Sequence, residues 1–248
     1  MFSNARRRLF FGFVTIVTLA LALAIFSRSA FSQATKDASK IRIGIIGSGN
    51  IGGTVGALWV KAGHPVLFSS RHPEKLKQFV EGLGPLARAG TVKEALNFGD
   101  VVFIAVPYGA YPQIGRDYAG DFRGKVVLDA GNAVPSRDGE IVKEANANGI
   151  GITSAKYLAG ARIVRAFNTL NYRILAREAN RSGSRMAIPI AGDDKEALNA
   201  ASRLVRDAGF DPVIIGSLES AKQFARGGPL YGQEITAKEM QERLKTLK

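Results

Sequence analysis

The stretch that decides the fold reads Ile41-Arg42-Ile43-Gly44-Ile45-Ile46-Gly47-Ser48-Gly49-Asn50-Ile51-Gly52. Its first half, residues 41–46, is a short apolar run that predicts a buried strand. Its second half, residues 47–52, has the spacing G-x-G-x-x-G and opens a segment with helical character that ends at Gly63. Such a glycine pattern is weak evidence alone. Between a strand and a helix, it is the pattern that binds the pyrophosphate of a dinucleotide.

Each of the three glycines has a separate physical reason in such a turn. Gly47 permits the tight turn, and Gly49 has no side chain, so a pyrophosphate can approach the backbone. Gly52 lets the helix pack close to the strand. The beginning of the helix offers unpaired N–H groups and a partial positive charge to phosphates. We therefore expect residues 47–52 to hold the pyrophosphate of a nicotinamide dinucleotide.

The end of the second predicted strand, residues 66–68, indicates which nicotinamide cofactor is bound. An NAD-binding domain places an acid there, about 20 residues after the glycines, to hold the ribose hydroxyls. This chain has no acid at the strand end, and it has Ser70 and Arg71, followed by Lys75. A serine hydroxyl, a guanidinium fork and a second cation suit a phosphate dianion. We therefore predict NADP, with His72 beside the adenine rather than in catalysis.

The rest of the chain alternates between strand and helix signals. Further strands are predicted over residues 101–106, 125–129, 162–167, 186–191 and 213–215. Helices are predicted over residues 73–81, 91–97, 194–208 and 236–247, and the second and fourth begin with the capping boxes Thr91/Glu94 and Thr236/Glu239. Continuous apolar strands separated by helices indicate a parallel sheet covered on both faces, which the strands at 162–167 and 186–191 should complete. The expected fold class is α/β, a Rossmann-type doubly wound, mostly parallel sheet with a small C-terminal α/β extension.

Composition excludes several kinds of site. The 248 residues contain no cysteine, so disulfides, thiolate metal sites and a cysteine nucleophile are excluded. With only two histidines, His64 and His72, we expect no metal site. The net charge of +13 suits an anionic ligand or a membrane surface. No basic tract carries interleaved aromatic residues, so we predict no nucleic-acid partner.

The N-terminal segment has the pattern of an export signal or a membrane anchor. Arg6-Arg7-Arg8 precedes an uncharged run of eighteen residues, 9–26, and residues 27–34 are mostly small and polar. The run would span about 27 Å as a helix, so a cleaved signal and a retained anchor both remain open. The arginines resemble a twin-arginine signal and favour the cytoplasmic side. We expect residues 35 onward to lie outside the cytoplasm, either in the periplasm or anchored to the inner membrane through residues 9–26.

Several motifs together resemble the NADP-dependent reductases of the deazaflavin coenzyme F420, and the related reductase domain of six-transmembrane metalloreductases. The resemblance covers about residues 41–232. It includes the glycine turn and the Ser70-Arg71 pair. The later motifs are Ala105-Val106-Pro107, Arg165-Ala166-Phe167-Asn168-Thr169, Ala191-Gly192-Asp193-Asp194, the segments 204–212 and 216–218, and Gly228-Pro229-Leu230-Tyr231.

The resemblance implies a role for each matching position. The pyrophosphate would be lined by Ser48, Gly49, Asn50 and Ile51, and the 2′-phosphate would be held by Ser70, Arg71 and Lys75. Val106 and Pro107 would border the nicotinamide, with Asn132 close to the ribose or the nicotinamide. Asn168 and Thr169 would face the pocket of the second substrate, although Asn168 is equally suited to capping the following helix.

The implied function is an NADP(H)-dependent oxidoreductase that passes hydride between the nicotinamide and a flavin-like or deazaflavin acceptor. Such a reaction needs little side-chain acid or base chemistry. Two alternatives remain open: a non-catalytic NADP-binding sensor or scaffold, and a reductase of a small carbonyl or imine substrate assisted by Tyr108 or Asn168. For Tyr108, Tyr111 and Tyr157 we expect packing or stacking rather than acid catalysis.

The expected domain organisation has four parts. Residues 1–34 form the signal or anchor and residues 35–40 a linker. Residues 41–180 form the NADP-binding domain, and residues 181–248 form an extension packed on the same domain. A homodimer is compatible with this organisation.

Overall fold

The computed structural model describes residues 40–247. The predicted signal or anchor, residues 1–34, lies outside the described residues. So does the predicted linker, residues 35–40, except for Lys40. Within residues 40–247, no helix is both long enough and apolar enough to cross a membrane.

The described residues form an α/β fold around a single sheet of eight strands. The strands are β1 (Ile43–Ile46), β2 (Val66–Ser69), β3 (Ala87–Gly90), β4 (Val101–Ile104), β5 (Val126–Asp129), β6 (Arg162–Arg165), β7 (Ala187–Gly192) and β8 (Asp211–Gly216). Their order across the sheet is β3-β2-β1-β4-β5-β6-β7-β8. The first six strands are parallel and follow the order of the doubly wound Rossmann fold, so the predicted fold class is confirmed.

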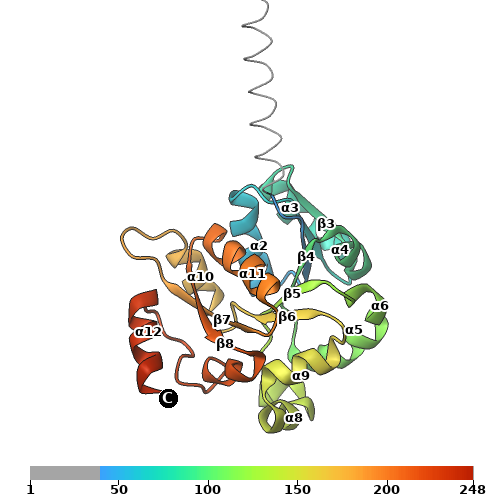
Figure 1. The fold of residues 1–248 in the computed structure, drawn as a ribbon. Helices are drawn as coiled ribbons and strands as arrows, with labels where there is room; N and C mark the ends of the chain where they lie inside the picture. The colour runs from blue at the N-terminus through green and yellow to red at the C-terminus, as the bar shows by residue number, and fades with distance from the viewer. Residues whose placement is uncertain (1–39, 248) are drawn as a thin grey trace, which may run out of the picture. The chain divides into compact units, whose positions relative to one another are not determined.

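Helices connect the strands (Figure 1). The α-helices are α2 (Asn50–Lys61), α3 (Lys77–Leu83), α4 (Val92–Phe98), α5 (Tyr111–Asp117), α6 (Ala119–Phe122), α7 (Pro135–Asp138), α8 (Ile141–Asn148), α9 (Ile150–Tyr157), α10 (Tyr172–Glu178), α11 (Lys195–Asp207) and α12 (Ala237–Thr246). Three 3-10 helices are η1 (Pro73–Leu76), η2 (Tyr108–Ala110) and η3 (Leu218–Gln223). Both expected capping boxes are present, at Thr91 of α4 and Thr236 of α12.

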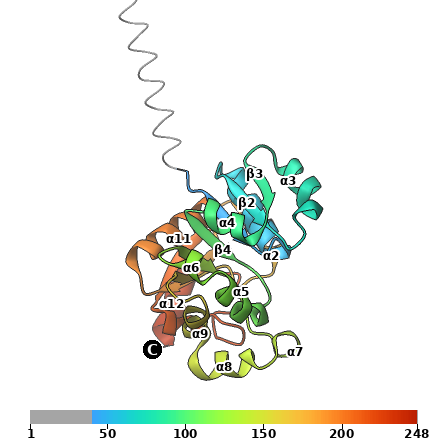
Figure 2. The same cartoon turned by 90° about the vertical axis from the view of Figure 1, so that its right-hand side faces the viewer.

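Alternate residues of the central strands belong to two separate cores, one on each face of the sheet. Ile45 of β1 and Phe103 of β4 pack in one core with residues of α2, α10 and α11, including Trp59. Ile46 and Ile104 pack in the other core with residues of α4, α5, α8, α9 and α12. Figure 2 is turned so that α4, α5, α6 and α9 face the viewer. Because both faces are covered, the central strands β1 and β4 are apolar throughout, as expected for a parallel sheet.

One predicted strand runs in the opposite direction to that expected. β7 is antiparallel to β6, with Val164 paired to Gly192, whereas residues 186–191 were expected to complete the parallel set. The link between the two strands contains only a seven-residue helix, α10, which packs against α2. The chain therefore enters β7 at the edge of the sheet where β6 ends. A parallel β7 would require the chain to cross back to the edge where β6 begins. β8 then pairs in parallel with β7.

Candidate functional site

The candidate site lies at the carboxyl ends of the parallel strands, where the strand order reverses between β1 and β4. The chain leaves β1 into the glycine turn, residues 47–49, and leaves β4 into residues 105–107. In an open α/β sheet, connections on the two sides of this point diverge to opposite faces, and ligands bind in the crevice that is left. The predicted pyrophosphate and nicotinamide residues are therefore brought together at this crevice.

The three glycines of the turn meet different surroundings. Gly47 has a φ of 96°, and a Cβ there would lie 2.7 Å from the carbonyl oxygen of Ala105. A Cβ at Gly52 would lie 1.9 Å from the carbonyl oxygen of Gly47. A Cβ at Gly49 meets no protein atom within 4 Å. The fold itself requires glycine at the first and third positions, whereas at Gly49 the space beside the backbone is free for a ligand.

The beginning of α2 is suited to an anion. Gly49 is its N-cap residue, no side chain makes a capping hydrogen bond, and no acid lies in its first turn. Its first N–H groups therefore have neither a side-chain acceptor nor a nearby negative charge. Ser48 Oγ donates a 3.0 Å hydrogen bond to the carbonyl oxygen of Ser69, which ties the turn to the end of β2.

A first pocket, here called cavity A, has a volume of about 680 Å³ and lies between the glycine turn, the end of β2 and α5. It is lined by Gly47, Ser48, Gly49, Ser70 and Arg71, together with Val106 and Pro107. Ser69 also lines it, and its buried hydroxyl has no hydrogen-bond partner among the described residues.

The predicted 2′-phosphate residues are only partly assembled at cavity A. Arg71 is exposed and lines the cavity, whereas Lys75 is exposed on η1 and does not line it. Ser70 Oγ accepts a 3.0 Å hydrogen bond from the backbone N–H of His72. The ring of His72 lies 3.3 Å from the carboxylate of Glu74, away from the lining.

A second pocket, cavity B, has a volume of about 450 Å³ and shares Val106 and Pro107 with cavity A. It is lined by Asn50 and Ile51 at the beginning of α2, by Asn132 after β5 and by Asn168 after β6. Sequence reasoning missed other residues that line it. These are Arg137, Tyr172, Arg226 and Tyr231, which come from loops and helices whose approach to the sheet has no local signal. Gly52 and Thr169 are buried and line neither cavity.

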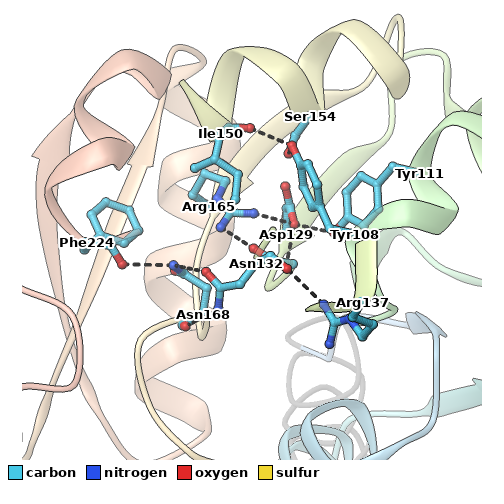
Figure 3. A network of polar contacts seen from close by, with 11 residues as sticks. Tyr108, Tyr111, Asp129, Asn132, Arg137, Ile150, Ser154, Arg165, Asn168 and Phe224 are labelled. Atoms are coloured by element: carbon cyan, nitrogen blue, oxygen red, sulfur yellow. Dashed lines mark hydrogen bonds and ion pairs between the residues drawn. The ribbon is translucent and has the colours of Figure 1, made fainter. Parts of the chain in front are cut away.

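Asn132 and Asn168 contact one another across cavity B (Figure 3). Asn132 Nδ2 donates to the carbonyl oxygen of Asn168 at 2.7 Å, and Asn168 Nδ2 donates to the carbonyl oxygen of Phe224 at 3.0 Å. Asn168 is 4% exposed, and its Oδ1 has no hydrogen-bond partner among the described residues. Asn168 does not cap the following helix, because the side chain of Asn171 caps α10 instead.

The backbone immediately before Asn168 is strained. Phe167 has a φ of 59°, a conformation that a bulky residue rarely adopts. Its ring is fully buried and packs edge-on against Trp59 and Phe103. The reversal at Phe167 places the phenyl ring in the core while Asn168 reaches Phe224. Strain of this kind is found where a site demands a particular side-chain direction.

A buried polar network supports the wall of cavity B (Figure 3). Asp129 Oδ1 accepts from Tyr111 Oη at 2.5 Å and from the backbone N–H of Gly131 at 2.8 Å, and it pairs with Arg165. Burial, with the nearby negative charge of Asp129, raises the pKa of Tyr111 well above its ordinary value. Burial also raises the pKa of Tyr108, whose hydroxyl donates to the carbonyl oxygen of Ile150. Neither tyrosine lines cavity A or cavity B.

Sequence reasoning did not assign roles to Asp129 and Arg165. The signal available was a charged residue at the end of each of two apolar strands, β5 and β6. Tyr157, the third tyrosine considered, donates from its hydroxyl to Glu144 at 2.6 Å and lines neither cavity.

Part of the chain is similar to a known protein family. Residues 42–133 match the family described as NADP oxidoreductase, coenzyme F420-dependent. The match includes the glycine turn, Ser70, Arg71, Val106, Pro107 and Asn132, and it confirms the resemblance seen in the sequence. Asn168 and the residues of the C-terminal extension lie beyond it.

Individual proteins are similar to this chain over a longer stretch. Metalloreductase STEAP3 of Rattus norvegicus is 30% identical over 202 residues, which are 79% of this chain and 38% of that protein. The crystal structure of a hypothetical protein of Sinorhizobium meliloti is similar with a TM-score of 0.70 and 27% identity, covering 82% of this chain and 98% of that one. A proposed F420-dependent NADP reductase of Arthrobacter sp. FB24 shares the fold, with a TM-score of 0.61 and 20% identity over 73% of this chain and 87% of that one.

Proposed function

We propose that this chain is an NADP(H)-dependent oxidoreductase that passes hydride between the nicotinamide and a flavin-like or deazaflavin acceptor. The observation that carries the proposal is that cavities A and B share Val106 and Pro107 in their linings, at the switch point of the sheet. Cavity A suits a phosphorylated adenosine, and cavity B leaves room for a second, planar molecule.

The residues of cavity A fit the dinucleotide. Gly49 and the uncapped beginning of α2 would hold the pyrophosphate, and Ser70 and Arg71 would hold the 2′-phosphate. The unpartnered hydroxyl of Ser69 would gain a partner from the bound nucleotide. Lys75 contributes as a more distant positive charge.

The residues of cavity B suit positioning rather than proton transfer. Of the described residues that line it, none is a carboxylate, a histidine or a lysine. NADPH held there would supply a hydride, and a flavin-like acceptor would take up that hydride together with a proton from water. The chain would orient the reacting rings through Val106, Pro107 and Asn132, with the unpartnered Oδ1 of Asn168 as an acceptor at the wall.

The assay is oxidation of NADPH followed at steady state against flavins, a deazaflavin, quinones, ketones and cyclic imines. We expect turnover with flavin or deazaflavin acceptors. Tight NADPH binding without turnover would favour a sensor or scaffold, and turnover with carbonyl or imine substrates alone would favour the third alternative. The structure counts against Tyr108 as the proton donor of that alternative, because its hydroxyl is buried on Ile150 and Ser154.

The cellular location is a separate proposal that rests on residues 1–34. We propose export or inner-membrane anchoring, with the oxidoreductase domain outside the cytoplasm. Fractionation of cells that express the chain with and without residues 1–34 tests it. A full-length product found wholly in the cytosol would contradict the proposal.

A further inference from the structure

Beyond the wall of cavity B lies a third pocket, cavity C, with a volume of about 550 Å³. We propose that Arg226 and Lys222 of cavity C bind an anionic group of the hydride acceptor. That the ligand is a hydride acceptor rests on the function proposed above, whereas Lys222 and cavity C take no part in that proposal.

Cavity C adjoins cavity B along a short boundary. Arg226 lines both pockets, and the loop of residues 132–134 contributes Asn132 and Val134 to cavity B and Ala133 to cavity C. A molecule whose ring occupies cavity B can therefore extend past Arg226 into cavity C. The far side of cavity C is formed by the end of α8 and the beginning of α9.

The two cations of cavity C are not neutralised by the protein. Lys222 and Arg226 are exposed, and neither side chain makes an ion pair or hydrogen bond with another residue in the range 40–247. Arg137 of cavity B differs, because it forms a 2.8 Å ion pair with Asp138. Glu219 is the one acid among the described residues that line cavity C. A lysine and an arginine at one pocket suit a phosphate or carboxylate.

Neutral donors complete the lining. Asn146 and Asn148, which carry neutral amides, line the pocket, as does Gly149, the glycine that precedes α9. No side chain caps α9, so its first N–H groups have no side-chain acceptor. The ligand class that matches both pockets is a planar ring joined to a flexible anionic side chain.

Riboflavin and flavin mononucleotide are suitable probes, because they share the ring and the ribityl chain and differ in one phosphate. Binding of each to the full-length chain, saturated with NADP, is measured by quenching of flavin fluorescence. The variants are the Lys222→Ala/Arg226→Ala double variant and, as a matched control, Lys143→Ala. Lys143 is an exposed lysine of α8 that pairs with Glu140 and does not line cavity C.

We expect the unaltered chain and Lys143→Ala to bind flavin mononucleotide about tenfold more tightly than riboflavin. The double variant should lose this preference with little change in riboflavin affinity. Equal affinities in the unaltered chain, no binding of either flavin, or a preference that survives in the double variant would each overturn the inference.

NADPH oxidation is measured separately on the same proteins. A phosphate preference in binding without turnover would keep the anion site and reject the proposed reaction. Turnover without a phosphate preference would support the proposed reaction and reject the anion site.

Discussion

Arg165 and Asp129 form an ion pair in which both side chains are completely buried, with 2.7 Å between Arg165 Nη1 and Asp129 Oδ1. The pair also holds both sides of Gly131, because Asp129 accepts from its N–H and Arg165 Nη2 donates to its carbonyl oxygen at 2.5 Å. Gly131 lines cavity B and precedes Asn132. Two buried charges thus set the position of a segment that borders the proposed nicotinamide site (Figure 3).

Arg165→Met should lower the free energy of unfolding by about 3–5 kcal/mol, because it leaves the buried carboxylate of Asp129 without its partner. The Arg165→Met/Asp129→Leu double variant should regain part of this loss, since no unpaired charge remains. Urea unfolding measures both effects. A single variant as stable as the unaltered chain would contradict the role of the pair.

Gly49→Ala and Gly52→Ala should have opposite consequences. At Gly49 the backbone φ of −77° is compatible with alanine, and the added methyl group meets no protein atom within 4 Å. The free energy of unfolding should therefore change by less than about 1 kcal/mol. NADPH affinity should fall about tenfold or more, because the methyl group occupies the space proposed for the pyrophosphate. At Gly52 the methyl group collides with a backbone carbonyl, which should destabilise the fold by about 1–3 kcal/mol. Fluorescence titration with NADPH and urea unfolding separate the two effects, and normal NADPH binding by Gly49→Ala would refute the assignment.

Arg71→Ala should weaken NADP binding by about 1.5–3 kcal/mol and leave NAD binding nearly unchanged, because only NADP has the phosphate that the guanidinium would contact. Lys75→Ala should have a smaller effect, since Lys75 does not line cavity A. Lys77→Ala, an exposed lysine at the beginning of α3, serves as the control. Calorimetric titration with both dinucleotides measures the difference. Equal losses for NADP and NAD after Arg71→Ala would count against the assignment.

Asp138 should make stability depend on acid pH. Burial alone would raise its pKa, but Arg137 and the backbone N–H groups of Val134 and Gly109 bind the carboxylate and hold its pKa below the ordinary value. A lowered folded-state pKa adds stability that is complete above the unfolded-state value of about 3.9 and is lost as pH falls through the folded-state value.

Asp138→Asn should therefore be less stable at pH 7, by about 1–3 kcal/mol, and should lose less stability than the unaltered chain between pH 5 and pH 3. Urea unfolding across this range provides the comparison. Parallel stability curves for the two proteins would show that Asp138 contributes no pH dependence.

Local patterns were sufficient to predict several elements of the fold. The capping boxes at Thr91 and Thr236 form between residues three apart, so their formation needs no knowledge of the fold. The strand before Gly47 and the helix after it likewise lie within one short segment. β3 was missed because its residues, Ala87–Gly90, are small or charged and lie at an edge of the sheet, where burial leaves little mark on the sequence.

The sequence by itself determined that a glycine turn joins a buried strand to a helix, and that Arg71 rather than an acid follows the second strand. Steric limits on glycine and the spacing of apolar residues act within a few positions, so they can be read locally. Only the tertiary structure decided the direction of β7, the pairing of Arg165 with Asp129 and the placement of Arg226 between two pockets. Those depend on how distant segments pack, because the energy of a buried pair or a shared cavity wall arises only when the chain brings its parts together.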